Sequence, residues 1–161
     1  MAIKKIFVGV DPGSKGAIAL LDPTTMQVAF IDLSLTMPQV MAEIRAYEDS
    51  QPEGTAYSAM IEDVASLPNV SAKSNFSFGY NLGSVTTLLM AMALPLDKVR
   101  PKAWQSYVGI KPKSPTIKKD VAEIVTRLYP TCDIYGPRGG LIDGRSDALA
   151  IAHYHFKTSQ V

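Results

Sequence analysis

Apolar and polar residues alternate in short blocks along the first part of the chain. Apolar runs cover residues 5–10, 17–21 and 27–32, and the turn sequences Asp-Pro-Gly-Ser and Asp-Pro-Thr-Thr separate them. Three runs so closely spaced predict an antiparallel meander of three strands. Residues 56–61 show the pattern of another buried strand, and residues 95–99 predict a short fifth strand.

Helical spacing follows the meander and recurs to the end of the chain. Thr36, with Pro38 and Gln39 after it, is typical of a helix start. The segments expected to be helical are residues 37–47, 75–93, 101–107, 118–128 and 144–156. This order of elements predicts one α/β domain over residues 1–161, with a mixed five-stranded sheet (three antiparallel strands, then parallel ones) flanked by helices.

The helix expected over residues 75–93 carries the clearest periodicity. Its apolar residues recur at steps of four and three: Phe78, Leu82, Val85, Leu89 and Met92. Ordinary core packing explains such a stripe, and a helix that forms a dimer is the alternative. Gly79 and Gly83 lie beside the stripe and leave room for another backbone.

The composition is typical of a soluble globular protein. The chain has 161 residues, of which 47% are apolar and 19% charged. We expect no membrane partner and a cytoplasmic location, because no apolar run is long enough to span a bilayer. A single cysteine, Cys132, excludes an intramolecular disulfide and a thiolate metal site.

Charge is spread unevenly although the net charge is only +1. Residues 64–119 hold eight basic side chains and one acidic side chain, Asp97, which is a local excess of seven positive charges. Such an excess favours a polyanionic partner such as nucleic acid. A solvated lysine-rich face is the alternative.

Four acidic residues lie at positions that the apolar pattern predicts to be buried. Asp11 ends the first strand and Glu62 ends the fourth, while Asp143 and Asp147 lie one helical turn apart before an apolar run. Uncompensated charges in such positions would cost a few kcal/mol, so a divalent cation such as Mg²⁺ or Mn²⁺ is expected to offset them. Carboxylates from strand ends and one helix suit a two-metal site for phosphodiester hydrolysis.

Several segments together resemble a known family, the RuvC-type Holliday-junction resolvases, especially their bacteriophage branch. The resemblance covers residues 6–156 and rests on VGVDPGSKG, MIEDV, FGYNLGSV, VRPKAWQSYVGI and DGRSDALAIAHYH. It implies an RNase H-like fold, a homodimer, and a Mg²⁺-dependent endonuclease with two ions per site, in which Mn²⁺ substitutes. The implied activity is paired nicking of four-way DNA junctions in recombination and repair, in the host cytoplasm if the protein is phage-encoded.

The resemblance also assigns residues. Asp11, Glu62, Asp143 and Asp147 match the family's catalytic metal ligands, and Lys118 matches a lysine close to the scissile phosphate. We expect further contacts with DNA from Lys15, Lys73, Phe76, Lys102, Lys111, Lys113 and Lys119.

The chain departs from the cellular bacterial members in two ways. Those proteins space their last two metal-binding positions three apart, whereas Asp143 and Asp147 are four apart, as in the phage pattern. They also carry an aromatic residue shortly after the strand-end glutamate, where this chain has Ala65. We expect Phe76 to stack on a base instead, because Phe78 belongs to the apolar stripe.

Two other functions stay open from the sequence. A phosphotransferase of the actin and sugar-kinase type also ends its first strand in an aspartate and a glycine-rich turn, although this chain is short for paired domains. A non-catalytic junction-binding module on the same fold is the second alternative. His153 and His155 are expected to be structural or exposed, and Trp104 and Tyr107 are expected to be core residues.

Overall fold

The structure, a computed structural model, describes residues 3–66 and 68–160. Its strands are β1 (Lys5–Asp11), β2 (Ala17–Asp22), β3 (Gln27–Asp32), β4 (Ala56–Glu62) and β5 (Leu96–Val99). Its helices are α1 (Met37–Asp49), α2 (Ala72–Ala91), α3 (Pro101–Tyr107), α4 (Ile117–Leu128) and α5 (Asp143–Thr158). Every element expected from the sequence is present, with bounds that differ by three residues or fewer.

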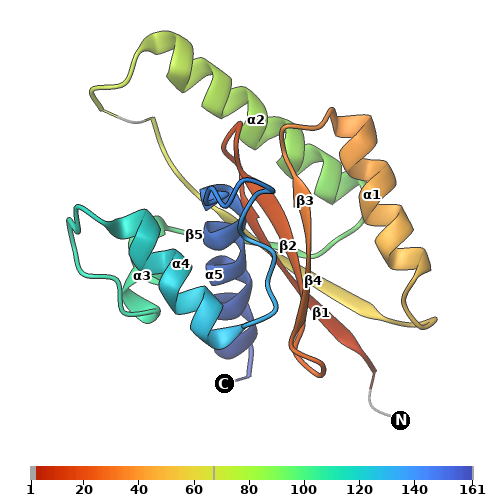
Figure 1. Cartoon of the computed structure of the whole chain (residues 1–161). Coiled ribbons are helices and arrows are strands. Elements are labelled where there is room, and N and C mark those ends of the chain that lie inside the picture. Colours follow the sequence, from red (N-terminus) through yellow and green to blue (C-terminus); the bar gives the residue numbers. More distant parts are fainter. Residues whose placement is uncertain (1–2, 67, 161) are drawn as a thin grey trace.

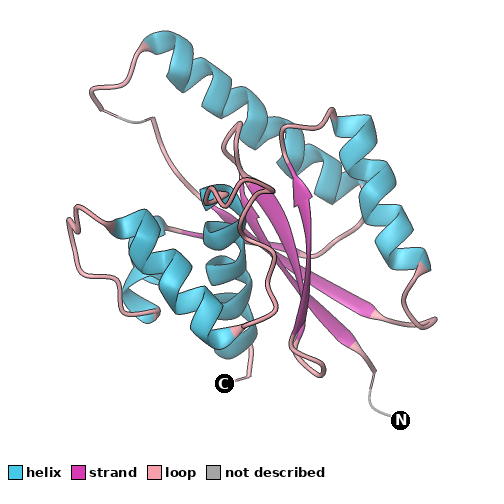
Figure 2. Ribbon diagram, viewed as in Figure 1, coloured by secondary structure: helices cyan, strands magenta, loops and turns pink. Residues whose placement is uncertain are grey.

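The strands form one mixed sheet in the order β3-β2-β1-β4-β5. The pairs β1–β2 and β2–β3 are antiparallel, and the pairs β1–β4 and β4–β5 are parallel. This confirms the expected α/β architecture. Because β1 and β4 run in parallel, with Val10 opposite Ile61, their carboxyl ends lie side by side (Figure 2).

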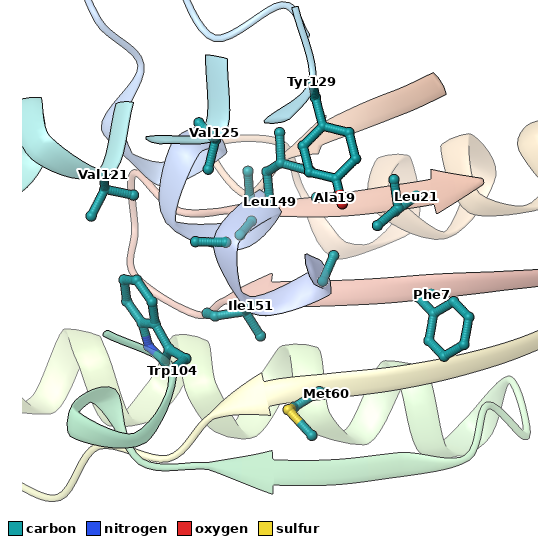
Figure 3. Packing of buried hydrophobic residues seen from close by; sticks show 14 of the residues in the cluster. Phe7, Ala19, Leu21, Met60, Trp104, Val121, Val125, Tyr129, Leu149 and Ile151 are labelled. Atoms are coloured by element: carbon teal, nitrogen blue, oxygen red, sulfur yellow. The ribbon is translucent and has the colours of Figure 1, made fainter. Parts of the chain in front are cut away.

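The sheet separates the core into two layers, and the pleat of the central strand β1 sends alternate side chains into each layer. Val8 and Val10 point to the face covered by α1 and α2, whereas Phe7 points to the face covered by α5. On β4, Met60 shares the α5 face with Phe7 (Figure 3). The alternation therefore places Asp11 and Glu62, which end these two strands, on the side of the sheet that α5 covers.

Helix α5 lies directly on β1 because glycines remove the side chains between them. A Cβ on Gly9 would lie 2.1 Å from the carbonyl oxygen of Ala148. At the start of α5, Gly144 forms a β-bridge with Gly16, and a Cβ on Gly144 would lie 2.1 Å from the carbonyl oxygen of Lys15. These contacts bring the first turn of α5 to the end of β1, next to Asp11.

Helix α2 packs on the sheet along only part of its length. Val85 and Leu89, in its second half, are fully buried. Its first half extends past the edge of the sheet (Figure 1), and Phe78 there is only partly buried. The apolar stripe is thus a core face in its second half alone. No helix within residues 3–66 and 68–160 has the length and apolar character needed to cross a bilayer.

Candidate active site

The four carboxylates expected from the sequence gather at one end of the sheet. Asp11 ends β1, Glu62 ends β4, and Asp143 and Asp147 occupy the first two turns of α5. All four side chains are partly buried. They are close enough that the charges of Asp11, Glu62 and Asp143 each raise the pKa of Asp147.

Asp147 is the most perturbed of the four. Burial in particular, and then the neighbouring negative charges, raise its pKa from 3.8 to about 8. Nearby Lys118 opposes this effect without cancelling it. The folded protein therefore places Asp147 where an ionised carboxylate needs a positive partner.

Glu62 accepts a hydrogen bond from Trp104, a residue that the sequence predicted only as part of the core. Burial raises the pKa of Glu62 to about 7, and the hydrogen bond from Trp104 opposes that rise. Trp104 Nε1 donates to Glu62 Oε1 at 2.8 Å, and the rest of the ring is buried beside α5 (Figure 3). A buried indole must satisfy its N–H, which is the signal that could have pointed to this role.

Asp11 stabilises the turn that follows β1 and also belongs to the acidic cluster. Its Oδ1 accepts a hydrogen bond of 3.1 Å from the backbone N–H of Gly13, as in an Asx turn. Burial nevertheless raises the pKa of Asp11, and the charge of Asp143 raises it further. The carboxylate thus stabilises the turn and is also close enough to Asp143 for that charge to act on it.

Lys118 supplies the cation nearest to the carboxylates. It lies in the first turn of α4, and its ammonium forms an ion pair with Asp143. The hydrogen bond to Asp143 and the charge of that carboxylate raise the pKa of Lys118, and Asp147 and Asp11 add to the effect. Lys118 therefore interacts with three of the four carboxylates, Asp11, Asp143 and Asp147.

The cluster opens into a cleft of about 660 Å³. The cleft lies between the β1–β2 turn, the first half of α2 and the start of α5. Its lining includes Asp11, Lys15, Lys73, Lys118 and Asp143. An adjoining cavity of about 290 Å³ is lined by Glu62, Trp104 and Asp147, and shares Phe78 and Lys118 with the cleft.

The residues expected to contact DNA do not all lie at this cleft. Lys15 and Lys73 line it. Phe76 does not line it, and 76% of its surface is exposed on α2, whereas Phe78 borders both cavities.

The remaining lysines lie outside both cavities. Lys102 lines a shallow hollow with Tyr107 and Tyr154, and Lys111 lines another beside α4. Lys119 pairs with Glu123 at 3.8 Å, and Lys113 is exposed with a positive φ of 57°.

The histidines have the structural roles expected of them. His153 Nδ1 and the hydroxyl of Tyr129 are 2.7 Å apart, and His155 Nε2 is 2.7 Å from Ser58 Oγ. Both histidines are buried, and burial lowers the pKa of each. Tyr107 differs from the expectation that it is a core residue, because 49% of its surface is exposed.

The chemistry of the donor set fits a hard divalent cation. Oxygen ligands of this kind suit Mg²⁺ and Mn²⁺, and these carboxylates are buried without enough positive charge to balance them. Within residues 3–66 and 68–160, however, no three His, Cys, Asp or Glu side chains are already arranged around one ion position. The carboxylates are neighbours, while Lys118 and Trp104 each engage one of them.

Comparison with known proteins identifies the fold. No protein-family model matches the sequence, and no curated protein is similar to it in sequence. Two solved structures of RuvC from Thermus thermophilus, one in complex with a Holliday junction substrate, each share 15% identity with the chain. Each alignment covers 96% of this chain and 95% of the other, with TM-scores of 0.60 for the complex and 0.55 for the second structure. The chain therefore has the RNase H-like α/β fold of the RuvC structures.

Proposed function

We propose that the protein is a Mg²⁺-dependent endonuclease that resolves four-way DNA junctions by paired nicks. The observation that carries this proposal is the cluster of partly buried carboxylates at the ends of β1 and β4 and the start of α5, with raised pKa values and an open cleft in front. The fold shared with a RuvC that binds a Holliday junction supports the same activity.

In this proposal each residue has a defined task. Asp11, Glu62, Asp143 and Asp147 would hold two Mg²⁺ ions, for which Mn²⁺ would substitute. Bound there, such ions would supply activation of a water and charge stabilisation of the leaving oxygen in phosphodiester hydrolysis. Lys118 leaves its ion pair with Asp143 and stabilises the negative charge that develops on the phosphate. Trp104 keeps Glu62 oriented through its N–H.

Branched DNA would approach along the basic side of the cleft. Lys15 and Lys73 lie beside the carboxylates, where they would contact phosphates next to the cut. Lysines farther away would contact the junction arms: Lys102, Lys111, Lys113 and Lys119. Phe76 is exposed on the part of α2 that extends past the sheet, so it is free to stack on an unpaired base at the junction centre.

Resolution of a junction calls for two cuts related by symmetry. A four-way junction has two-fold symmetry, and a two-fold homodimer presents two equivalent sites to it. The four-residue spacing of Asp143 and Asp147 favours the bacteriophage branch of this class, which would act in the host cytoplasm.

A cleavage assay tests the proposal. The purified protein is incubated with a labelled synthetic four-way junction, or with a linear duplex of the same sequence, in Mg²⁺ or in EDTA. We expect symmetric nicks in the junction that require Mg²⁺, with little cutting of the duplex. Asp147→Asn is expected to abolish the nicks, whereas Asp49→Asn, at the exposed end of α1, leaves them unchanged.

Two results would overturn the proposal. If the wild-type protein binds the junction but does not nick it, the chain is a non-catalytic junction-binding module. If Asp147→Asn cuts as fast as the wild type, the acidic cluster is not the site of hydrolysis.

A further inference from the structure

We propose that Arg145 is a positioning residue that fixes the first turns of α5, so that Asp143 and Asp147 face the end of β1. This inference rests on the proposed function, because it concerns two of the proposed metal ligands. Arg145 lies between them in sequence, but at 100° per residue it projects from nearly the opposite side of the helix. It can therefore hold the helix without occupying the cleft.

The guanidinium joins α5 to the edge of the sheet. Its Nε donates to Oδ1 of Asp32 at 2.8 Å, and its Nη2 donates to Oδ2 of the same carboxylate at 2.9 Å. Asp32 is the last residue of β3. Two parallel hydrogen bonds fix both the distance and the orientation of the pair, which a single point contact would not do.

The third nitrogen joins α5 to the loop that precedes it. Nη1 of Arg145 donates to the backbone carbonyl of Asp133 at 2.9 Å and to its Oδ2 at 3.0 Å. The guanidinium also lies 5.5 Å from the ring centre of Phe30 on β3. Only 17% of the Arg145 side chain is exposed, so its two bonds with Asp32 are partly shielded from water, whereas the side chain of Asp133 is exposed. One side chain thus connects β3, the loop and α5.

The first turn of α5 has little stabilisation of its own, so the contacts of Arg145 matter there. The residue that precedes the helix, Ile142, provides no side-chain cap for the free N–H groups. Asp143 and Asp147 also repel each other one turn apart, which favours fraying of the first turn. The bridge between Gly16 and Gly144 fixes the helix on one side, and Arg145 fixes it on the other.

A loose first turn would affect metal binding before it affected DNA binding. Partners that orient metal ligands typically contribute a factor of about 10 to 100 in metal affinity. Arg145 is mostly buried and does not line the cleft, so its loss should leave the DNA-facing surface intact.

The experiment compares Arg145→Met and Arg145→Lys with the wild type. Mn²⁺ binding to the DNA-free protein is measured from the electron paramagnetic resonance signal of unbound Mn²⁺, and junction cleavage gives kcat and KM. For Arg145→Met we expect about 10- to 100-fold weaker Mn²⁺ binding and a lower kcat at saturating Mg²⁺, with an unchanged KM for the junction. Arg145→Lys recovers part of the affinity, because a lysine keeps the charge but not the two parallel bonds.

Arg138→Met is the matched control, since Arg138 is exposed in the same loop and does not line the cleft. It should bind Mn²⁺ and cut as the wild type does. If Arg145→Met fails to fold, Asp133→Asn weakens one anchor only and should give a smaller loss of Mn²⁺ affinity.

The proposal is overturned if folded Arg145→Met, or Asp133→Asn in its place, binds Mn²⁺ as tightly as the wild type. It is also overturned if the loss appears only as a higher KM for the junction. A wild-type protein that binds no Mn²⁺ would contradict the proposed function itself, so the two failures are distinguishable.

Discussion

Asp147 lies where an ionised carboxylate costs the folded protein free energy. Burial and three neighbouring acids raise its pKa to about 8, and Glu62 is raised to about 7. The side chain of Lys118 is largely exposed to water, and its positive charge offsets only part of the rise in the pKa of Asp147. Side chains selected for stability alone would not produce such a group, so we interpret the cluster as functional.

Removing this charge should stabilise the metal-free protein. Folding raises the pKa of Asp147 above its ordinary value of 3.8, so stability is complete below that pH and falls as the pH rises toward about 8. In EDTA at pH 8, Asp147→Asn should therefore melt roughly 2 to 8 °C higher than the wild type, which corresponds to about 1 to 2 kcal/mol. The difference should shrink toward pH 4. Thermal melts followed by circular dichroism measure it, with Asp49→Asn as the control.

A lower melting temperature for Asp147→Asn in EDTA would assign Asp147 a structural role. An equal rise in Asp49→Asn would mean that general charge reduction, not the cluster, is responsible.

At the scale of elements, the close contact between α5 and β1 determines where the carboxylates meet. The sequence pattern predicted both elements, and the pleat explains why Asp11 and Glu62 share a face. Nothing in the neighbouring sequence shows that Gly9 and Gly144 must be glycines. The atoms that a side chain there would meet belong to backbone segments far away in the sequence. The packing of α2 was only partly predictable. The apolar stripe of this helix runs along its whole length, but only its second half lies on the sheet.

The same substitution at two helical glycines should have opposite effects. In Gly144→Ala the new Cβ would lie 2.1 Å from the carbonyl oxygen of Lys15, so α5 must shift, at a cost of about 1 to 3 kcal/mol. In Gly79→Ala the Cβ meets no described atom within 4 Å, and the alanine should stabilise α2 by up to about 1 kcal/mol. Urea unfolding of both variants measures the two changes.

We also expect Gly144→Ala to weaken Mn²⁺ binding, because the first turn of α5 moves with the helix. If Gly144→Ala is as stable as Gly79→Ala, the contact between α5 and the β1–β2 turn is not tight in solution.

At the scale of the whole molecule, the sequence predicted the strand and helix order and the mixed sheet. It also indicated which four acids lie together, because strand ends and one helix start can be located from periodicity. It did not reveal that Trp104 binds Glu62 or that Arg145 binds Asp32. Those partners are 42 and 113 residues apart, and only the folded chain brings them together.

The outer face of α2 bears on the proposed homodimer. Tyr80 and Met90 fall on one side of this helix, opposite its buried residues, and their exposed fractions are 68% and 65%. We expect the protein to sediment as a dimer and Tyr80→Lys or Met90→Lys to shift it toward the monomer. Tyr135→Lys, in the loop before α5, should not do so. A wild-type protein that sediments as a monomer at micromolar concentration would contradict the dimer.

In the proposed function, the four carboxylates form one site for divalent cations. Anomalous X-ray diffraction from crystals soaked in MnCl₂ locates bound Mn²⁺ without reference to activity. We predict two Mn²⁺ peaks about 4 Å apart in the cleft, ligated by Asp11, Glu62, Asp143 and Asp147, with Lys118 moved away from Asp143. No peak among these carboxylates, in crystals that bind Mn²⁺ elsewhere, would contradict it.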